Sequence, residues 1–360
     1  MSEPLDRQQA FAGTRPVSPA HHIEPERLAD YLKSHVDGFA GPLQIEQFKG
    51  GQSNPTYKLT TPSASYVLRR KPPGKLLASA HAVDREFRVI SALSSAGFPV
   101  PTPFHICADE TVIGSMFYVM AYVPGRVFWY PWAPGLDGKD RAALFGSLNE
   151  TIARLHSFNP TSLGLGDYGR PQGYVARQIK RWSEQYRASE TRHIAAMERL
   201  IQWLPGACPP DQPAAIIHGD FRLDNCIIDL HQPRIIAVLD WELSTLGDPV
   251  ADFTYHLMQW HMPLSQSGAG VGTLKGHEGE PGLPTFGAYV DAYCRRTGRK
   301  GIESLDVYLA YNFFRIAAIL QGIAGRVRDG TAANAHAAAM GSQVEPLAET
   351  GWAFAKRAGA

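Results

Sequence analysis

The sequence predicts an α+β protein with two lobes, a small antiparallel-sheet lobe over residues 23–123 and a mainly helical lobe over residues 124–360. Its 360 residues are roughly two to three times the usual size of one domain. Apolar residues alternate through 43–68, which indicates strands, and recur every three or four positions beyond 124, which indicates helices. Residues 1–22 mix charges with Gly and Pro, so we expect a flexible leader and no signal peptide there.

The composition is that of a folded protein without a general charge preference. Charged residues make up 19% and apolar residues 44% of the chain, and 35 Lys and Arg against 34 Asp and Glu give a net charge of +1. We therefore expect neither nucleic acid nor a membrane as a partner. The four cysteines lack the spacing of a zinc site or a disulfide framework, which favours a reducing, cytoplasmic location: Cys107, Cys208, Cys226 and Cys294.

The first lobe should contain a short helix around Leu28–Val36, five strands and a second helix. The strands are expected near 43–48, 57–59, 66–68, 104–107 and 116–123, and the second helix from Val83 to Gly97. Pro124 and Gly125 then form a plausible hinge. This arrangement predicts a small α+β unit.

The second lobe should be mostly helical, with one hairpin between Cys226 and Leu239. Two stretches rich in Gly and Pro read as long loops that either shape a substrate site or move freely. The expected helices lie near 144–155, 176–200, from 290, over 307–327 and in the tail, and the loops over 130–138 and 263–284.

The sharpest motif is the run His-Gly-Asp-Phe-Arg-Leu-Asp-Asn over 218–225, followed by Leu-Asp-Trp over 239–241. Phosphoryl transfer needs a carboxylate that orients the acceptor hydroxyl and oxygen ligands that hold Mg²⁺ against the nucleotide phosphates. Asp220 suits the first task, and Asn225 and Asp240 suit the second. The alternative is a surface hairpin with capping Asp and Asn residues.

This pattern resembles the aminoglycoside phosphotransferase and choline kinase-like family of the protein-kinase-like fold, whose catalytic loop reads His-Gly-Asp, four residues and Asn. The resemblance implies a bilobal fold with ATP and Mg²⁺ bound in the cleft and a small-molecule hydroxyl as acceptor. It leaves open GTP as the donor and the oligomeric state. His218 is expected to support the loop by hydrogen bonding, and Asp248 and Asp252 to cap a helix or support a loop.

The resemblance also assigns a nucleotide-binding loop to Gly50, Gly51, Ser53 and Asn54, between the first two predicted strands. Glycine lets backbone N–H groups approach phosphate oxygens, and Ser53 can add a hydroxyl donor. A simple hairpin turn is the alternative. The lobe connector is placed at Ala121, Tyr122 and Val123, where backbone groups would meet the adenine edge, although a strand that leads into a turn would look the same.

The phosphate-binding cation is predicted to be Arg69 rather than Arg70 or Lys71, because Arg69 shares a strand face with Val67. Its partner should be Glu86, which lies on the apolar face of the following helix. The alternative is that the two are unrelated surface charges. Arginine stands where the kinase pattern has lysine, which leaves open whether it fully replaces lysine.

The acceptor is expected to be neutral or anionic, because the segment 161–210 has more basic than acidic residues: Arg170, Arg177, Lys180, Arg181, Arg187, Arg192 and Arg199 against Asp167, Glu184, Glu190 and Glu198. A solvated helix of mixed charge is the alternative. The run Arg-Arg-Lys-Pro-Pro-Gly over 69–74, with 80–81 and 84–86, resembles the kinase-like domain of some multidomain acyl-CoA dehydrogenases. That resemblance implies a hydroxyacyl-CoA or related hydroxy acid; an aminoglycoside or amino alcohol, or a pseudokinase that only binds nucleotide, are the alternatives.

Overall fold

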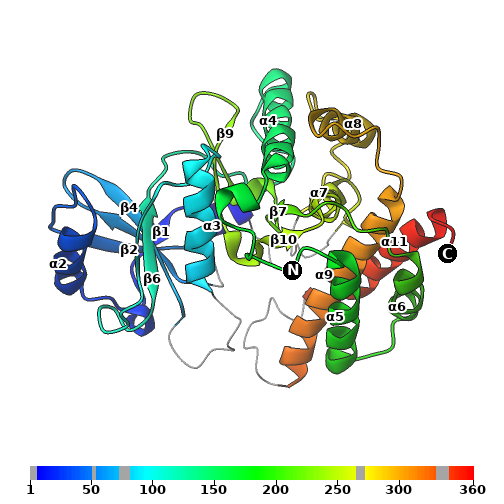
Figure 1. The fold of residues 1–360 in the computed structure, drawn as a ribbon, viewed down its shortest axis with the longest axis horizontal. Helices are drawn as coiled ribbons and strands as arrows, with labels where there is room; N and C mark the ends of the chain where they lie inside the picture. Colours follow the sequence, from blue (N-terminus) through cyan, green and yellow to red (C-terminus); the bar gives the residue numbers. More distant parts are fainter. Residues whose placement is uncertain (1–5, 51–53, 73–81, 265–271, 330–339) are drawn as a thin grey trace.

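The computed structural model describes residues 6–50, 54–72, 82–264, 272–329 and 340–360. Its first lobe is built on an antiparallel sheet of six strands in the order β1-β2-β3-β4-β6-β5 (Figure 1). The predicted α+β class and five of these strands are confirmed. The strands are β1 Thr14–Arg15, β2 Gln44–Phe48, β3 Thr56–Thr60, β4 Ser65–Arg70, β5 Pro103–Cys107 and β6 Phe117–Ala121.

Two helices cover the two faces of this sheet. Helix α2 (Pro25–His35) packs Leu28 and Leu32 against one face, and α3 (Val83–Ser95) packs against the other, which faces the second lobe. Side chains alternate along β4, so Leu68 lies under α2 whereas Val67 lies with α3. The same alternation turns Arg69 toward the second lobe, as predicted.

Residues 6–22, predicted as part of a flexible leader, instead form defined elements, so that prediction is corrected for them. They contain α1 (Arg7–Phe11), the edge strand β1, which pairs antiparallel with β2, and a short 3₁₀ turn, Pro19–His21. Asp6 caps α1 by accepting a hydrogen bond from the Gln8 amide at 3.0 Å. A five-residue helix has a weak apolar pattern, because its stability comes from packing against the rest of the protein.

The second lobe is mainly helical and encloses two short strand pairs. Its helices are α4 Gly138–Ser157, α5 Tyr174–Ser189, α6 Ala195–Ala207, α7 Pro249–Leu257, α8 Phe286–Arg296, α9 Leu305–Arg328 and α11 Val344–Arg357. The pairs are β7 (Ala215–Ile217) with β10 (Thr245–Gly247), and β8 (Cys226–Ile228) with β9 (Ile235–Val238), which is the predicted hairpin.

The predicted continuous helix over 176–200 is wrong, because the chain breaks between α5 and α6. Both helices pack against α9. Gln321 of α9 donates hydrogen bonds to the Ser189 carbonyl at 2.7 Å and to the Thr191 hydroxyl at 3.0 Å, which satisfies the end of α5. Tertiary packing therefore overrides the local helical pattern.

Helix α9 is long and apolar enough to cross a membrane by length and composition alone. In the structure it is a packed helix of the second lobe, with 67% of its most apolar 18-residue window buried. Among its buried residues are the polar Asn312 and Arg315. A helix at the core of a folded lobe explains these features.

The lobe connector approaches β8 so closely that only glycine fits at position 125. Arg126 exchanges two backbone hydrogen bonds of 2.8 Å with Ile228. A Cβ on Gly125 would lie 2.2 Å from Ile227 Cγ2 and 2.7 Å from the Ile228 carbonyl oxygen. Gly125 therefore allows the connector to lie against β8.

We expect Gly125→Ala to lower the free energy of unfolding by about 1–3 kcal/mol, because the added methyl group forces this contact apart. Urea denaturation would measure the change. The control is Gly146→Ala in α4, where an added Cβ meets no atom within 4 Å and the free energy of unfolding should stay the same or rise by about 0.5–1 kcal/mol. Equal stability of the two variants would contradict the steric explanation.

Candidate active site

The catalytic loop begins where β7 ends and is held by the buried carboxylate of Asp252. The backbone amides of His218 and Gly219 donate to Asp252 Oδ2 and Oδ1, both at 2.8 Å. Burial alone would raise the pKa of Asp252, but the hydrogen bond and charge of His156 and the proximity of His218 bring that pKa below its ordinary value. Asp252 therefore stays charged and supports the loop, as predicted.

His218 fixes the loop from its other side and is fully buried. The Asp220 amide donates to His218 Nδ1 at 3.2 Å, so the proton of the neutral ring sits on Nε2, which donates to the Leu239 carbonyl at 2.8 Å. This confirms the predicted supporting role. It also ties the catalytic loop to the residue that precedes Asp240.

The carboxylate of Asp220 is oriented by two neutral donors. The Tyr255 hydroxyl donates to Oδ1 at 2.9 Å, and Asn225 Nδ2 donates to Oδ2 at 3.2 Å and to the Asp220 main-chain oxygen at 2.9 Å. Arg222 adds a charge, with Nε 3.3 Å from Oδ1. The sequence analysis missed Tyr255, although it lies one helical turn after Asp252 in α7.

Asn225 and Asp240 are brought together by the β8–β9 hairpin, because the Leu239 amide donates to the Asn225 carbonyl at 2.8 Å. Asp240 has a left-handed backbone, with φ 66° and ψ 60°, directly after β9. Arg69 Nη2 donates to Asp240 Oδ1 at 2.6 Å. Asn225 Oδ1 and Asp240 Oδ2 accept no hydrogen bond from any described residue, so two oxygen ligands of the type Mg²⁺ prefers are available.

Arg69 is the centre of a buried charge cluster. Its Nε lies 2.9 Å from Glu86 Oε2, an ion-pair distance, although the N–H is not aligned for a hydrogen bond. Burial would lower the pKa of Arg69, but the charges of Glu86 and Asp240 raise that pKa above its ordinary value. Arg70 points to the other side of the sheet and donates to the Ser115 hydroxyl at 2.9 Å. The predicted pairing of Arg69 with Glu86 is thus confirmed.

The predicted nucleotide-binding loop is described only at its two ends, because Gly51 and Ser53 lie outside the described residues. Gly50 lines the inter-lobe cavity, and a Cβ there would lie 3.0 Å from the Trp129 ring. Asn54 is fully buried, and its Nδ2 donates to Glu86 Oε1 at 2.9 Å. The assignment of Asn54 to nucleotide contact is therefore corrected: it holds Glu86, because a buried carboxylate needs donors.

A cavity of about 770 Å³ lies between the lobes and is lined by Arg69, Asn225 and Asp240. Its walls are apolar and come from both lobes: Val67, Ile90, Met120, Phe128 and Val238. The predicted connector residues Ala121, Tyr122 and Val123 line it too. The amides of Ala121 and Tyr122 donate to Thr102 and Ser65 carbonyls at 2.8 and 3.4 Å. Among the described residues the Val123 amide has no acceptor, which leaves it available to an adenine edge.

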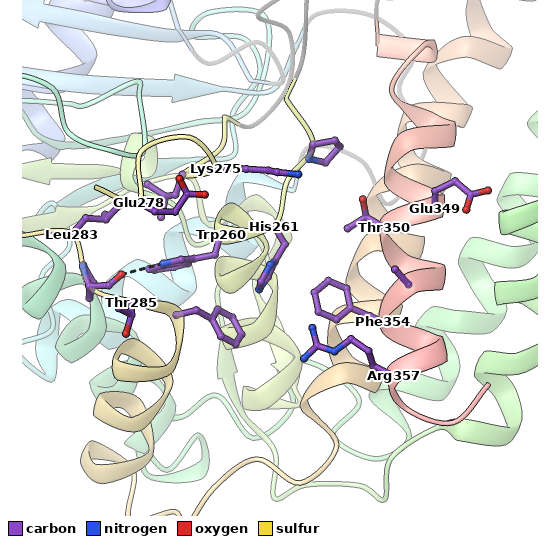
Figure 2. Close-up of a pocket in the computed structure, with 15 residues that line it drawn as sticks. Trp260, His261, Lys275, Glu278, Leu283, Thr285, Glu349, Thr350, Phe354 and Arg357 are labelled. Carbon is purple, nitrogen blue, oxygen red and sulfur yellow. Dashed lines mark hydrogen bonds between the residues drawn. The ribbon is translucent and has the colours of Figure 1, made fainter. Parts of the chain in front are cut away.

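A second cavity, of about 780 Å³, lies in the helical lobe (Figure 2). Trp260, His261 and Phe354 form one apolar side, and Lys275 and Glu278 bring charges to it. Trp260 is fixed there by donating Nε1–H to the Pro284 carbonyl at 3.2 Å. None of the lining residues belongs to the cluster around Asp240, so this cavity is not the phosphoryl-transfer site.

The basic segment 161–210 does not form the acceptor side as expected. Helices α5 and α6 pack on the far part of the lobe, against α9 and α11 (Figure 1). None of its seven basic residues, all described, lines the inter-lobe cavity. Four of them form ion pairs with glutamates: Lys180, Arg187, Arg192 and Arg199. The alternative of a solvated surface of mixed charge describes this segment.

His256 supports the catalytic loop from beneath and makes stability depend on pH. Its Nδ1 lies 3.2 Å from the Phe221 carbonyl oxygen and its Nε2 lies 2.9 Å from the Tyr289 hydroxyl. Burial lowers the pKa of His256 to about 4, whereas an unfolded histidine has a pKa of about 6.5. Between these values the unfolded chain binds a proton that the folded protein does not, so stability falls as pH falls.

We expect this residue alone to lower the free energy of unfolding by about 2 kcal/mol between pH 7 and pH 5. Urea denaturation at several pH values would measure the dependence, and His256→Gln should make it shallower. His231→Gln, an exposed change in the β8–β9 turn, is the control and should keep the wild-type dependence. An unchanged slope in His256→Gln would contradict the assignment.

The fold and the site together define a kinase-like phosphotransferase. The sequence model of the phosphotransferase enzyme family matches residues 44–308, and the chain belongs to this family. It is 43% identical over 351 residues to acyl-CoA dehydrogenase family member 10 of Mus musculus, covering 96% of this chain and 32% of that protein. The chain thus spans about a third of that relative's length.

Two solved structures resemble the whole chain. A candidate aminoglycoside phosphotransferase from Ralstonia eutropha is 45% identical, with a TM-score of 0.84 over 93% of this chain and 99% of that one. Spectinomycin phosphotransferase, solved with ADP and spectinomycin, has 13% identity and a TM-score of 0.62 over 94% of this chain and 100% of that one, a likeness of fold alone. The predicted bilobal protein-kinase-like fold is thereby confirmed.

Proposed function

We propose that this protein is an ATP- and Mg²⁺-dependent phosphotransferase that phosphorylates a hydroxyl group of a small molecule. The observation that carries the proposal is the convergence of Arg69, Asn225 and Asp240 on one inter-lobe cavity, with Asp220 hydrogen-bonded to Asn225 at its edge. Residues 23–123 and 124–360 would act as the nucleotide-binding and catalytic lobes. The family match and the neighbour that binds ADP support the nucleotide.

In this proposal the residues divide the work of an in-line transfer. Asp220 accepts the proton of the acceptor hydroxyl and aims its oxygen at the γ-phosphorus. Tyr255 and Asn225 fix that carboxylate, so little reorganisation is needed. Arg69, held by Glu86, binds the phosphates. Mg²⁺, held by Asn225 and Asp240, would neutralise charge on the phosphate oxygens when bound.

For the acceptor we propose a hydroxyacyl-CoA or a related hydroxy acid. The support is the name of the mouse relative, which is an acyl-CoA dehydrogenase family member, and the cationic Arg222 beside Asp220. An aminoglycoside or amino alcohol is cationic and would meet Arg222 with the wrong charge. We also propose a cytoplasmic location, which four free cysteines support.

The test has two stages on the full chain. Calorimetric titration with Mg·ATP should show binding that EDTA weakens, since the proposed metal ligands face the nucleotide cavity. A turnover screen should then find phosphorylation among hydroxyacyl-CoAs, hydroxy acids, aminoglycosides and amino alcohols. Binding without turnover of any acceptor would favour the pseudokinase alternative, and absence of Mg·ATP binding would overturn the proposal.

A further inference from the structure

Helix α1 lies across the mouth of the inter-lobe cavity and is fixed there by polar contacts. Gln8 Nε2 donates to the Val127 carbonyl at 3.1 Å, and its Oε1 accepts from the Trp129 amide at 3.3 Å. The Phe11 ring packs against the Trp129 ring, with centroids 5.1 Å apart. Beyond α1, strand β1 joins the sheet of the first lobe. The segment 6–15 therefore connects the two lobes at the cavity.

This placement directs Arg7 toward the catalytic loop. Its Nη2 lies 3.6 Å from Asp224 Oδ2, and its side chain is only 12% exposed. A Cβ on Gly272, from the predicted long loop over 263–284, would lie 3.6 Å from Arg7 Nη1. The guanidinium makes no hydrogen bond with any described residue, although a guanidinium carries five N–H donors.

The charges around Arg7 are not balanced by the protein alone. Asp224 is shared, because Arg222 Nη2 also lies 3.1 Å from its Oδ2. Arg222 Nε lies 3.3 Å from Asp220 Oδ1, but Asp220 must turn to the acceptor hydroxyl during transfer. Two guanidiniums then face one carboxylate, which leaves one positive charge beside the acceptor. Largely buried cations of this kind need a second anionic partner.

We propose that Arg7 is a specificity-determining residue that binds an anionic group of the acceptor, a carboxylate or a phosphate. This inference rests on the proposed function and adds the charge of the acceptor. The forked donors of arginine match either group, and the Arg7–Asp224–Arg222 cluster would hold it one loop away from Asp220. It replaces the basic segment 161–210 as the source of positive charge on the acceptor side.

The experiment uses matched acceptors that differ in charge: 3-hydroxybutyrate, its CoA thioester and its neutral methyl ester. Arg7→Gln should raise the KM of the charged acceptors by about 10–100-fold, the effect of losing a hydrogen bond to a charged group. The kcat, the KM of the methyl ester and the Kd of Mg·ATP should stay within about two-fold. Arg7→Lys should recover part of the loss, because it keeps the charge without the fork.

Arg15→Gln, an exposed change in β1, is the control and should match the wild type. A larger loss with 3-hydroxybutyrate than with the thioester would identify a carboxylate as the bound group, and the reverse a phosphate. Equal losses for charged and neutral acceptors, or a matching loss of Mg·ATP affinity, would overturn the inference alone. So would failure of both anionic compounds to bind the Mg·ATP-loaded wild type. Failure to bind Mg·ATP at all would overturn the proposed function as well.

Discussion

Replacing Asp220 by asparagine is expected to lower kcat by about 10²–10⁴-fold, the usual contribution of a general base. Asparagine has nearly the same shape but cannot accept the proton of the acceptor hydroxyl. The loop should keep its conformation, since Asp252 holds the amides of His218 and Gly219 and not the side chain of Asp220. Single-turnover phosphotransfer and calorimetric binding of Mg·ATP would measure the two effects separately.

The Kd of Mg·ATP should stay within about three-fold in Asp220→Asn, because the metal ligands are other residues. Asp229→Asn is a matched control: Asp229 lies in the turn of the β8–β9 hairpin and accepts a hydrogen bond from the His231 amide. It should leave both quantities unchanged. A variant that lost nucleotide binding together with turnover would make Asp220 a metal ligand, and full activity would remove it from the mechanism.

The parts of this structure that depend on local periodicity could be predicted from the sequence. Alternation along β4 was enough to choose Arg69 over Arg70, because the two side chains must point to opposite faces. Helical spacing placed Glu86 on the inner face of α3, where it pairs with Arg69. The hairpin between β8 and β9 follows from its strand pattern, and it brings Asp240 to Asn225.

Contacts between distant segments left no such mark. Arg7 and Asp224 are more than two hundred positions apart, and only the docking of α1 brings them together. Asn54 looks like a loop residue because it follows Gly-Gly, yet a buried carboxylate in another element uses its amide. The charge of the segment 161–210 misled the acceptor argument because composition does not say which face a helix turns outward.

Asp240 has two separate tasks, and the largest binding effect is expected from its removal. Asp240→Ala takes away a proposed metal ligand and the partner of Arg69 Nη2. It also puts alanine at φ 66°, which costs about 1–2 kcal/mol in a left-handed backbone. We therefore expect the affinity for ATP in the presence of Mg²⁺ to fall by about 100-fold or more, toward the value measured in EDTA.

Asp240→Asn separates these effects, because asparagine tolerates the left-handed conformation and keeps one oxygen. It should retain the free energy of unfolding of the wild type, whereas Asp240→Ala loses part of it. Both variants should show a reduced difference between ATP binding with and without Mg²⁺, since each lacks the charged ligand. Titration of each variant in Mg²⁺ and in EDTA provides the measurement. A difference in both variants as large as in the wild type would show that Asp240 does not hold the metal, and the loss of stability in Asp240→Ala would then report backbone strain alone.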